Sequence, residues 1–250
     1  MFYTRFNVSK LLDYKEEYSR YSGIYFPLIG WFIGGITAII FLASSLVLND
    51  YISVIIALLS GVIATGAIHE DGLADTIDGM GGGWNKEARL KIMKDSSIGA
   101  FGTLGLVFTV FLKISLLSEV YALSNNTISI ILFTIIAHSL SRFVAVTFMY
   151  SHEYARSDEN SKSSNLVTKM GFSSISYAFI WGILPLVIYS VYSEFYYFLT
   201  IPLVCFIIKA FLGKFFQKRI GGYTGDTLGA TQQITEIVIF IQILVICRFI

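Results

Sequence analysis

Seven stretches of this chain are long enough and apolar enough to cross a lipid bilayer. A hydrocarbon core of about 30 Å is spanned by about 20 residues of α-helix, and a helix satisfies its own backbone hydrogen bonds there. The stretches are 27–48, 51–68, 98–118, 128–150, 173–192, 195–212 and 228–247. The second and sixth are short and the last begins with polar residues, so six spans are the alternative. The sequence therefore predicts an all-α, polytopic membrane protein of about seven transmembrane helices.

Composition supports one membrane-embedded unit. Charged residues make up 14% of the chain, against about 25% in typical soluble proteins. The sequence contains no internal repeat, low-complexity tract or separate soluble segment that we can detect, so we expect a single integral-membrane domain over 1–250. Cys205 and Cys247 lie singly within apolar stretches and indicate neither a disulfide framework nor a zinc site. We expect a lipid bilayer around the chain and no nucleic-acid partner.

Lys and Arg residues occupy every second connection between the apolar stretches. They occur before the first stretch and in 69–97, 151–172 and 213–227, whereas 49–50, 119–127 and 193–194 contain none. The positive-inside rule places the basic connections in the cytoplasm. We therefore predict a multi-pass protein of the cell (inner, cytoplasmic) membrane with a cytoplasmic N-terminus and a cytoplasmic-face active site. Residues 1–26 are predicted to form a cytoplasmic or interfacial segment, either an amphipathic helix in the interface or a helix packed on the protein.

Four carboxylates follow the second apolar stretch, in AIHEDGLADTIDGMGGGW at 67–84. Asp71, Asp75 and Asp78 are spaced i, i+4 and i+7, so they share one face if the second stretch continues as a helix. Three like charges on one face favour a hard divalent cation, and we predict an Mg²⁺ site. Glu70 points about 100° away from Asp71 on such a helix, so it would support the ligands or bind a second ion. An acidic, solvated loop is the alternative.

A second polar segment, GGYTGDTLGATQQITE, covers residues 221–236. Asp226 is its best metal candidate, and we expect it to complete the site of the first segment because both loops lie on the same predicted face. Gly225 and its neighbouring glycines would allow the backbone N–H groups to approach a phosphate, although a tight loop between two spans is the alternative. Gln233 and Glu236 follow as substrate-binding candidates, and a carboxylate within an apolar span is usually functional.

Cationic side chains complete the candidate site. Lys94 follows the acidic cluster, and Arg156 lies in the next basic connection. Arg142 lies about eight residues inside the fourth span, or about 12 Å at 1.5 Å per residue. A buried Arg needs a partner, which could be one of the carboxylates or a substrate phosphate. His138, one turn away, is interpreted as a packing residue.

Carboxylates that bind a metal, glycine-rich turns and cations on one face indicate phosphoryl transfer, with a hydroxyl as acceptor. The residues alone indicate a membrane-embedded nucleotidyl- or phosphatidyl-type transferase. An attacking hydroxyl must lose its proton, and Asp78 is our first candidate for the base because it lies farthest from the bilayer, with Glu70 as the alternative.

At HEDGLADTIDG, residues 69–79, the chain resembles the cobalamin synthase family, the membrane enzymes also called adenosylcobinamide-GDP ribazoletransferases. The resemblance runs almost from end to end. Further matches are Thr4-Arg5-Phe6, FPLIG at 26–30, KIMKDSSIGAFG at 91–102, SR at 141–142, YAR at 154–156 and GGYTGDTLGATQQITE.

This resemblance implies a late step of vitamin B12 biosynthesis. The enzyme would join α-ribazole, or its 5′-phosphate, to adenosylcobinamide-GDP and release GMP with Mg²⁺, a transfer similar to that of CDP-alcohol phosphatidyltransferases. The chain departs from the family pattern at Ser97, where the family often has Arg, and at SDENSKSSN, 157–165, where it has a Gly-rich tract. The loss of that Arg removes one phosphate contact.

Three alternatives remain open at this point. Another membrane phosphotransferase of the CDP-alcohol phosphatidyltransferase type would fit the same carboxylates. An ion-coupled transporter would fit the ionisable residues within spans, but it requires such groups near the bilayer midplane rather than at one surface. Gly30 and Gly34 form a GxxxG pattern, which allows either a homo-oligomer or helix packing within one chain.

Overall fold

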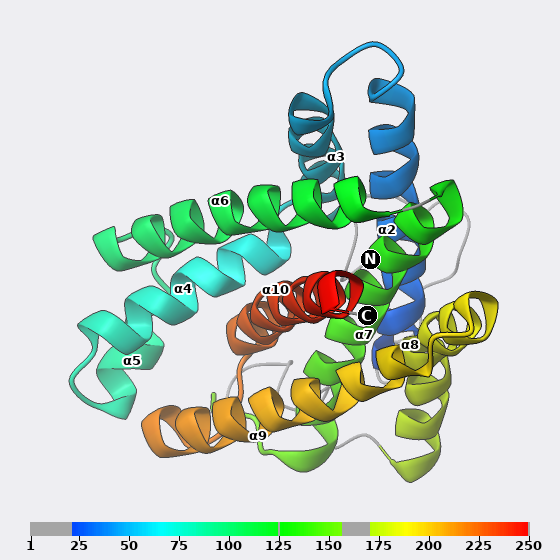
Figure 1. Ribbon diagram of the computed structural model, residues 1–250. Helices are drawn as coiled ribbons and strands as arrows, with labels where there is room; N and C mark the ends of the chain where they lie inside the picture. The colour runs from blue at the N-terminus through cyan, green and yellow to red at the C-terminus, as the bar shows by residue number, and fades with distance from the viewer. Residues whose placement is uncertain (1–21, 125, 157–170, 250) are drawn as a thin grey trace, which may run out of the picture.

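The computed structural model describes residues 22–124, 126–156 and 171–249, and the described chain is helical throughout (Figure 1). The predicted segment 1–26 falls largely outside this range, and so does the departure at 157–165. The elements are η1 (Ser22–Tyr25), α2 (Phe26–Ser44), α3 (Asp50–Thr65), α4 (Ile68–Gly82), α5 (Lys86–Ile92), α6 (Ala100–Leu123), α7 (Thr127–Ser151), α8 (Phe172–Ser193), η2 (Tyr196–Thr200), α9 (Ile201–Ile220) and α10 (Gly225–Phe249).

Six helical segments of the described chain are long and apolar enough to cross a membrane. They are Gly23–Ser44, Ala100–Leu123, Thr127–Ser151, Phe172–Ser193, Tyr196–Ile220 and Gly225–Phe249. A seventh span results only if α3 and α4, which meet at an angle of 87°, count as one broken span. Large apolar side chains on the outside, such as Phe108, Leu203 and Phe211, are 66–71% exposed, as a lipid-facing surface requires. The prediction of an all-α polytopic membrane protein is confirmed.

The junction between α3 and α4 corrects one expectation. Gly66 and Ala67 both adopt left-handed backbone conformations, with φ of 72° and 61°, and end α3. The N–H of Ala67 donates to the carbonyl of Val62 at 3.0 Å, a bond typical of a helix C-terminus. The second span therefore does not continue straight into the acidic motif, which forms a helix of its own. Asp71, Asp75 and Asp78 keep their spacing because all three lie within α4.

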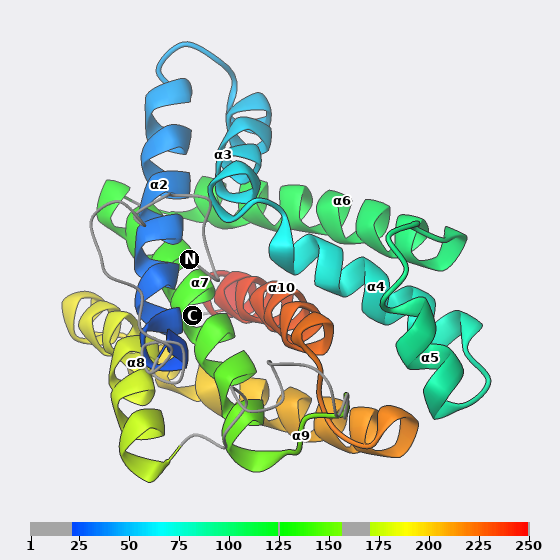
Figure 2. The same ribbon diagram turned by 180° about the vertical axis from the view of Figure 1, so that it is seen from behind.

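Helix α7 forms the centre of the molecule and packs against α2, α8 and α10 (Figures 1 and 2). Gly30 and Gly34 allow α2 to approach it closely. A Cβ atom on Gly30 would lie 2.4 Å from the carbonyl oxygen of His138, and one on Gly34 would lie 2.8 Å from the Cα of Ile135. The GxxxG pattern thus serves helix packing within the chain, one of the two alternatives that the sequence leaves open.

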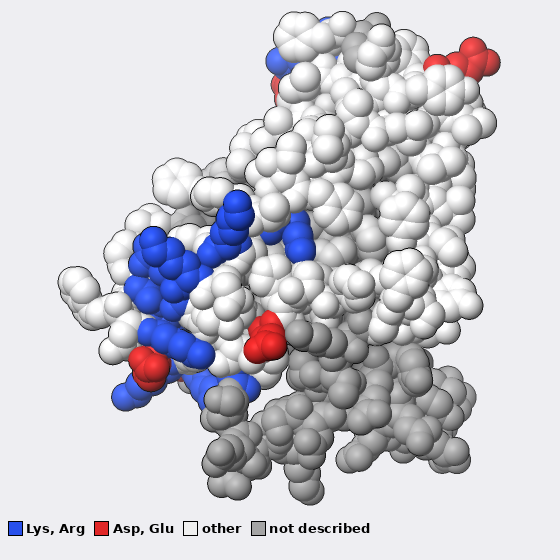
Figure 3. Space-filling model, turned by 90° about the horizontal axis from the view of Figure 1, so that it is seen from below, with Lys and Arg blue, Asp and Glu red and all other residues white. Residues whose placement is uncertain are grey.

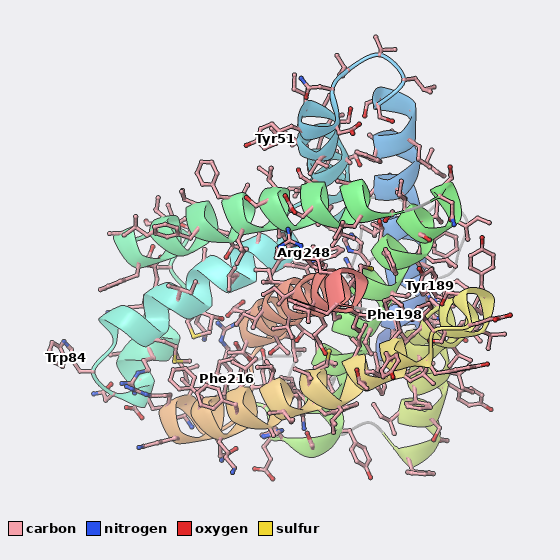
Figure 4. All side chains as sticks on the ribbon, in the orientation of Figure 1. Tyr51, Trp84, Tyr189, Phe198, Phe216 and Arg248 are labelled. Atoms are coloured by element: carbon pink, nitrogen blue, oxygen red, sulfur yellow. The ribbon has the colours of Figure 1, made fainter. Side chains whose placement is uncertain are left out.

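Aromatic side chains join the start of α7, the end of α8 and η2. Figure 4 shows Tyr189 and Phe198 beside one another, and their ring centroids are 5.0 Å apart. Phe133 of α7 contacts both rings, at 4.5 Å and 5.6 Å. This apolar, tightly packed end contrasts with the region around α4, α5 and the start of α10, where the charged residues predicted to be functional lie.

Candidate active site

Two glycines bring the acidic motif of α4 against the start of α10. A Cβ atom on Gly72 would lie 2.9 Å from the carbonyl oxygen of Asp226 and 3.0 Å from its Cα. A Cβ atom on Gly229 would lie 3.2 Å from the carbonyl oxygen of His69. Any larger residue at Gly72 would push the two backbones apart. The expectation that the two polar segments are neighbours is therefore confirmed.

The turn before α10 is built from backbone hydrogen bonds. The N–H of Tyr223 donates to the carbonyl of Glu153 at 2.9 Å, and the N–H of Ala155 donates to the carbonyl of Tyr223 at 2.8 Å. Gly221 has φ of 81° and ends α9, while Gly222 has φ of 154° and would place a Cβ 2.0 Å from the Glu153 carbonyl oxygen. These two glycines therefore have structural roles.

Gly225 differs from its neighbours because it is exposed and has open space around it. It begins α10, where unpaired N–H groups attract anions. Thr224 and Thr227 stabilise the start of this helix. The N–H of Thr224 donates to the Thr227 hydroxyl at 2.8 Å, and the N–H of Thr227 donates to the Thr224 hydroxyl at 3.3 Å. Of the three glycines, Gly225 keeps its predicted role as a phosphate contact.

Asp226 lies in the first turn of α10 and pairs with Arg156. The Arg156 Nη2 atom is 2.5 Å from Asp226 Oδ2 and also donates to the carbonyl of Met93 at 3.3 Å. The backbone pairing at residues 153–155 carries Arg156 to this position. The structure thus brings Arg156, predicted to bind phosphate, directly to Asp226, predicted to bind metal.

Asp71 and Asp75 lie on the α4 face nearest to this pair. Asp71 is exposed and Asp75 is half-buried. Asp75 interacts electrostatically with Asp71, Asp226 and Asp78, and with Arg156 as the opposing charge. A continuous region of negative charge therefore extends from α4 to the start of α10. We refer to Asp71, Asp75 and Asp226 together as the acidic face.

Asp78 is buried, with its carboxylate facing α6. The N–H of Gly99 donates to Oδ2 at 2.7 Å and the N–H of Gly102 donates to Oδ1 at 2.8 Å. These bonds satisfy two of the N–H groups left open at the start of a helix, where Gly99 offers no side chain of its own. This cap was not predicted from the sequence. The segment IGAFG has no Ser, Thr, Asp or Asn to cap α6, and this absence is a signal that a residue from another helix does so. The predicted roles of Asp78 as metal ligand and base stay predictions.

Glu70 faces the interior rather than the acidic face. Its Oε1 accepts a hydrogen bond from Gln233 Nε2 at 2.9 Å, whereas Oε2 is buried and has no hydrogen-bond partner among the described residues. Gln233 thus links α10 to α4.

A buried charge cluster lies deeper, between α6, α7 and α10. Glu236 is fully buried, and its Oε1 lies 2.6 Å from Lys113 Nζ. Its Oε2 lies 3.4 Å from His138 Nδ1 and accepts a hydrogen bond from Gln232. The sequence analysis missed Lys113, although a single Lys within the apolar stretch 98–118 is itself a signal of a functional or paired residue.

Arg142 belongs to this cluster but has no ion pair with a carboxylate in the described part of the chain. Its Nη1 donates to the carbonyl of His138 at 2.9 Å and lies 3.1 Å from His138 Nδ1. The guanidinium also lies over the Phe26 ring, 5.6 Å from its centroid, and Nε has no partner among the described residues. The sequence leaves two partners open for Arg142. A carboxylate forms no ion pair with it among the described residues, and a substrate phosphate stays a prediction.

Basic residues form a pocket on the other side of Arg156. This basic pocket has a volume of about 440 Å³, and Lys86, Lys91, Lys94 and Arg156 line it. Arg89 holds α5 in place, because its Nη1 donates to the carbonyl of Arg219 at 3.2 Å. Figure 3 shows Lys and Arg side chains gathered on one side of this face. Glu87 also lines the pocket, which therefore keeps an excess of positive charge, and Arg156 connects it to the acidic face.

The segment between α5 and α6 carries Ser97, where the related family often has Arg. The backbone N–H of Ser97 donates to Asp95 Oδ1 at 2.9 Å. This bond lowers the pKa of the exposed Asp95 carboxyl from its ordinary value. Both residues are exposed, so an Arg at position 97 would meet no steric obstacle from burial.

The carboxylates fit a magnesium site in chemistry, although no three of them form a ready cage. No group of three or more His, Cys, Asp or Glu side chains among the described residues is arranged to hold a metal ion. Mg²⁺ does not need such a cage, because proteins usually hold it through one or two carboxylates, waters and substrate phosphates. Asp71 and Asp75, at i and i+4 on α4 and opposite Asp226, fit that mode.

Comparison with known proteins places the chain in a family. The cobalamin-5-phosphate synthase family matches residues 1–245. Similar curated proteins are the adenosylcobinamide-GDP ribazoletransferases of Shewanella pealeana and Shewanella piezotolerans, 38% and 39% identical over 245 residues that cover 98% of this chain and 92% of each relative. That of Shewanella oneidensis is 38% identical over 98% of this chain and 91% of its own length. No solved structure shows significant similarity. This chain belongs to the cobalamin-5-phosphate synthase family.

Proposed function

We propose that this protein is an adenosylcobinamide-GDP ribazoletransferase that joins α-ribazole, or its 5′-phosphate, to adenosylcobinamide-GDP and releases GMP. One observation carries the proposal beyond the family relationship. The acidic face lies between a basic pocket and the open N-terminus of α10, an arrangement suited to a diphosphate whose charge must be neutralised while one phosphoryl group is transferred.

The reaction exchanges one bond to phosphorus. The ribose hydroxyl oxygen bonds to the phosphorus that carries the cobinamide, and the bond from that phosphorus to the bridging oxygen breaks. GMP leaves with the bridging oxygen, and the hydroxyl proton passes to a carboxylate. Mg²⁺ held by Asp71, Asp75 and Asp226, with Asp78 behind them, would neutralise the diphosphate and assist the departure of GMP.

The other polar residues bind and orient the diphosphate in this proposal. Arg156 and Lys94 contact its oxygens from the basic pocket, and the N–H groups at Gly225 bind them at the start of α10. When the substrate arrives, Arg156 exchanges its contact with Asp226 for one with a phosphate, which leaves the Asp226 carboxylate available.

Between the two candidate bases, the hydrogen bonds favour Glu70. Both oxygens of Asp78 already accept backbone hydrogen bonds, whereas Oε2 of Glu70 has no hydrogen-bond partner among the described residues. A base must reach the proton directly or through one water. Glu70 precedes Asp71 in the first turn of α4 and faces the interior next to the acidic face. We therefore propose Glu70 as the proton acceptor and Asp78 as the residue that positions α4.

The test is Mg²⁺-dependent GMP release from adenosylcobinamide-GDP and α-ribazole in membranes that contain the protein. We expect activity that EDTA abolishes and Mg²⁺ restores, with a loss of orders of magnitude in Asp75→Asn. Asp95→Asn is the matched control, since Asp95 is an exposed carboxylate near the site that we assign no role. Equal rates in Asp75→Asn and Asp95→Asn would contradict the metal assignment.

The buried charge cluster is the specific observation that favours a different function. Intramembrane Lys113, Glu236 and Arg142 are residues that an ion-coupled transporter could use. Reconstituted protein that moves a labelled solute but releases no GMP would support transport. Transfer from a CDP-alcohol, without reaction of adenosylcobinamide-GDP, would support the phosphatidyltransferase alternative.

A further inference from the structure

A cavity of about 360 Å³ lies behind the acidic face, among α2, α3, α4, α6, α7 and α10. Its outer wall is aliphatic and comes from α3 and α6, including Leu59, Val62, Leu106 and Val110. Its inner end is polar and contains the buried charge cluster. We refer to this space as the α3–α6 cavity. Its volume falls within the range of about 300–1,000 Å³ typical of small-molecule sites.

Polar atoms without partners are concentrated around this cavity. In the described part of the chain, six of its lining side chains have a buried polar atom with no hydrogen bond. They are Thr37 Oγ1, His69 Nε2, Glu70 Oε2, Arg142 Nε, Gln233 Oε1 and Glu236 Oε1, the last of which is ion-paired with Lys113. Buried polar atoms are nearly always paired in proteins, so a cluster of exceptions indicates a missing partner. The cavity therefore combines apolar walls with unused hydrogen-bonding groups, a combination typical of a specific ligand site.

The inner end of the cavity contains a guanidinium with an unused donor. Arg142 is 99% buried and interacts electrostatically with Glu236 and Glu70, but it forms no ion pair with a carboxylate among the described residues, and its Nε has no hydrogen bond there. A planar guanidinium binds acceptor atoms and stacks on aromatic rings. A ligand with a ring-nitrogen acceptor would complete its hydrogen bonds.

The α3–α6 cavity adjoins the acidic face at Glu70. His69 and Glu70 line the cavity, while Asp71 and Asp75 belong to the acidic face, so the first turn of α4 contributes to both sites. Gln233 lines the cavity and holds Glu70 from α10. A molecule bound in the cavity could therefore extend one end past Glu70 toward the diphosphate.

We infer that the α3–α6 cavity binds the planar aromatic base of the riboside substrate, with the ribose hydroxyl directed past Glu70 to the acidic face. This inference rests on the proposed function. Of the two substrates, only the riboside is small enough, because the corrinoid nucleotide is a large macrocycle with a charged diphosphate. The base places its apolar rings against α3 and α6 and its ring nitrogen toward Arg142 or His69.

Binding of α-ribazole, measured by calorimetry on protein in lipid nanodiscs, tests the site without turnover. Val62→Phe fills the cavity, and Ile63→Phe is the matched control, because Ile63 is the next residue on α3, is 63% exposed and does not line the cavity. We expect Val62→Phe to raise the Kd for α-ribazole at least tenfold and Ile63→Phe to leave it within twofold. Equal affinity in the two variants overturns the inference.

A second pair of variants, on α6, keeps the inference testable if Val62→Phe fails to fold. Val110 lines the cavity and Val107 does not, although their exposed fractions are 45% and 43%. Val110→Phe should raise the KM for α-ribazole and leave the KM for adenosylcobinamide-GDP unchanged, while Val107→Phe should change neither. A phospholipid that co-purifies with the wild type and is lost from Val110→Phe, with unchanged α-ribazole binding, would assign the cavity to a lipid and overturn the inference.

The reaction and the pocket can fail separately. Asp75→Asn protein should bind α-ribazole as tightly as the wild type, because Asp75 lies outside the cavity. Binding of α-ribazole without GMP release would contradict the proposed reaction and support the inference that the cavity binds the riboside. GMP release with the same KM for α-ribazole in Val110→Phe and Val107→Phe would remove the pocket and support the reaction.

Discussion

The acidic face and the buried charge cluster contain the same kinds of side chain in opposite surroundings. At the acidic face, Asp71 is exposed and Asp75 and Asp226 are partly exposed, with Arg156 as the neighbouring cation. In the buried cluster, Glu236 is 0% exposed and pairs with Lys113 from another helix. Charged side chains that water can reach are free to exchange partners with a substrate. A buried carboxylate that loses its cation is not stabilised by water in its place. Charges at the acidic face can therefore exchange partners with a substrate, whereas the Lys113–Glu236 ion pair stabilises the packing of α6 against α10.

The largest effect on the reaction should come from the residue between the two regions. Glu70→Gln keeps the shape of the side chain and an acceptor for Gln233 but removes the proposed base. We expect turnover to fall by about 10²–10⁴-fold, the usual contribution of general-base catalysis. Thermal unfolding in detergent should stay near that of the wild type.

Asp78→Asn is the comparison for this prediction. If Asp78 is the base instead, Asp78→Asn protein should stay folded with α6 in place and lose turnover, while Glu70→Gln retains it. If Asp78 acts as the cap of α6, Asp78→Asn should lower thermal stability together with activity.

The next largest effect should be on stability, in the buried charge cluster. Glu236→Gln leaves Lys113 as an uncompensated buried cation, and breaking a buried pair in this way destabilises a protein by about 3–5 kcal/mol. We expect a lower thermal midpoint in detergent and less folded protein in the membrane. Asp71→Asn should leave the midpoint almost unchanged, because Asp71 is exposed.

The double variant Glu236→Gln with Lys113→Met sharpens this test. Removing both charges should recover most of the stability, since neither ion is then left without its partner. Stability equal to that of Glu236→Gln alone would mean that Glu236 acts mainly through His138 or Arg142.

A smaller effect is expected where the two polar segments touch. Gly72→Ala places a methyl group 2.9 Å from the Asp226 carbonyl oxygen, so it should shift α10 against α4 by a few tenths of an ångström. Turnover depends on such positions, and we expect it to fall more than tenfold with only a modest loss of stability. Gly35→Ala is the control because nothing lies within 4 Å of its Cβ, and it should leave turnover unchanged.

The smallest effect concerns the exposed Ser97. Ser97→Arg adds a cation beside the basic pocket, and we expect the KM for adenosylcobinamide-GDP to fall a few-fold at low ionic strength. The gain should disappear in high salt, because exposed charges are screened over about 10 Å at 0.1 M. An unchanged KM at low ionic strength would place residue 97 away from the diphosphate.

The sequence predicts the helices because apolar length is a local property. It predicts the approach of the two polar segments because the Lys and Arg residues of the connections place both segments on one face. It does not predict the 87° turn between α3 and α4. Gly66 is a familiar helix terminator, but a left-handed Ala67 has no sequence signal, since Ala is the strongest helix former. The hydrogen bond from the Ala67 N–H to the Val62 carbonyl and the close approach of α4 to α10 at Gly72 and Gly229 accompany that conformation.

The sequence also does not predict which side chains of different helices contact one another. Glu236 was expected to bind substrate, and Arg142 to pair with a carboxylate or a substrate phosphate. The rotation of each helix about its axis decides which cation lies nearest to Glu236, and that cation is Lys113. The substrate contacts of Glu236 and Arg142 stay predictions. Asp78 was grouped with the metal ligands because it continues the helical spacing of Asp71 and Asp75. Its buried side chain also accepts hydrogen bonds from two N–H groups at the start of α6, and its role as a metal ligand stays a prediction.

The capping of α6 by Asp78 couples the position of the cavity wall to the position of the acidic face. Helix α6 supplies one wall of the α3–α6 cavity, and α4 carries the carboxylates of the acidic face. Because the Asp78 carboxylate binds the first turn of α6 through both oxygens, α6 cannot tilt away from α4 at that end without breaking these bonds. Residue 78 therefore fixes the start of the cavity wall relative to the helix that carries the carboxylates, so a substitution there would affect both sites together.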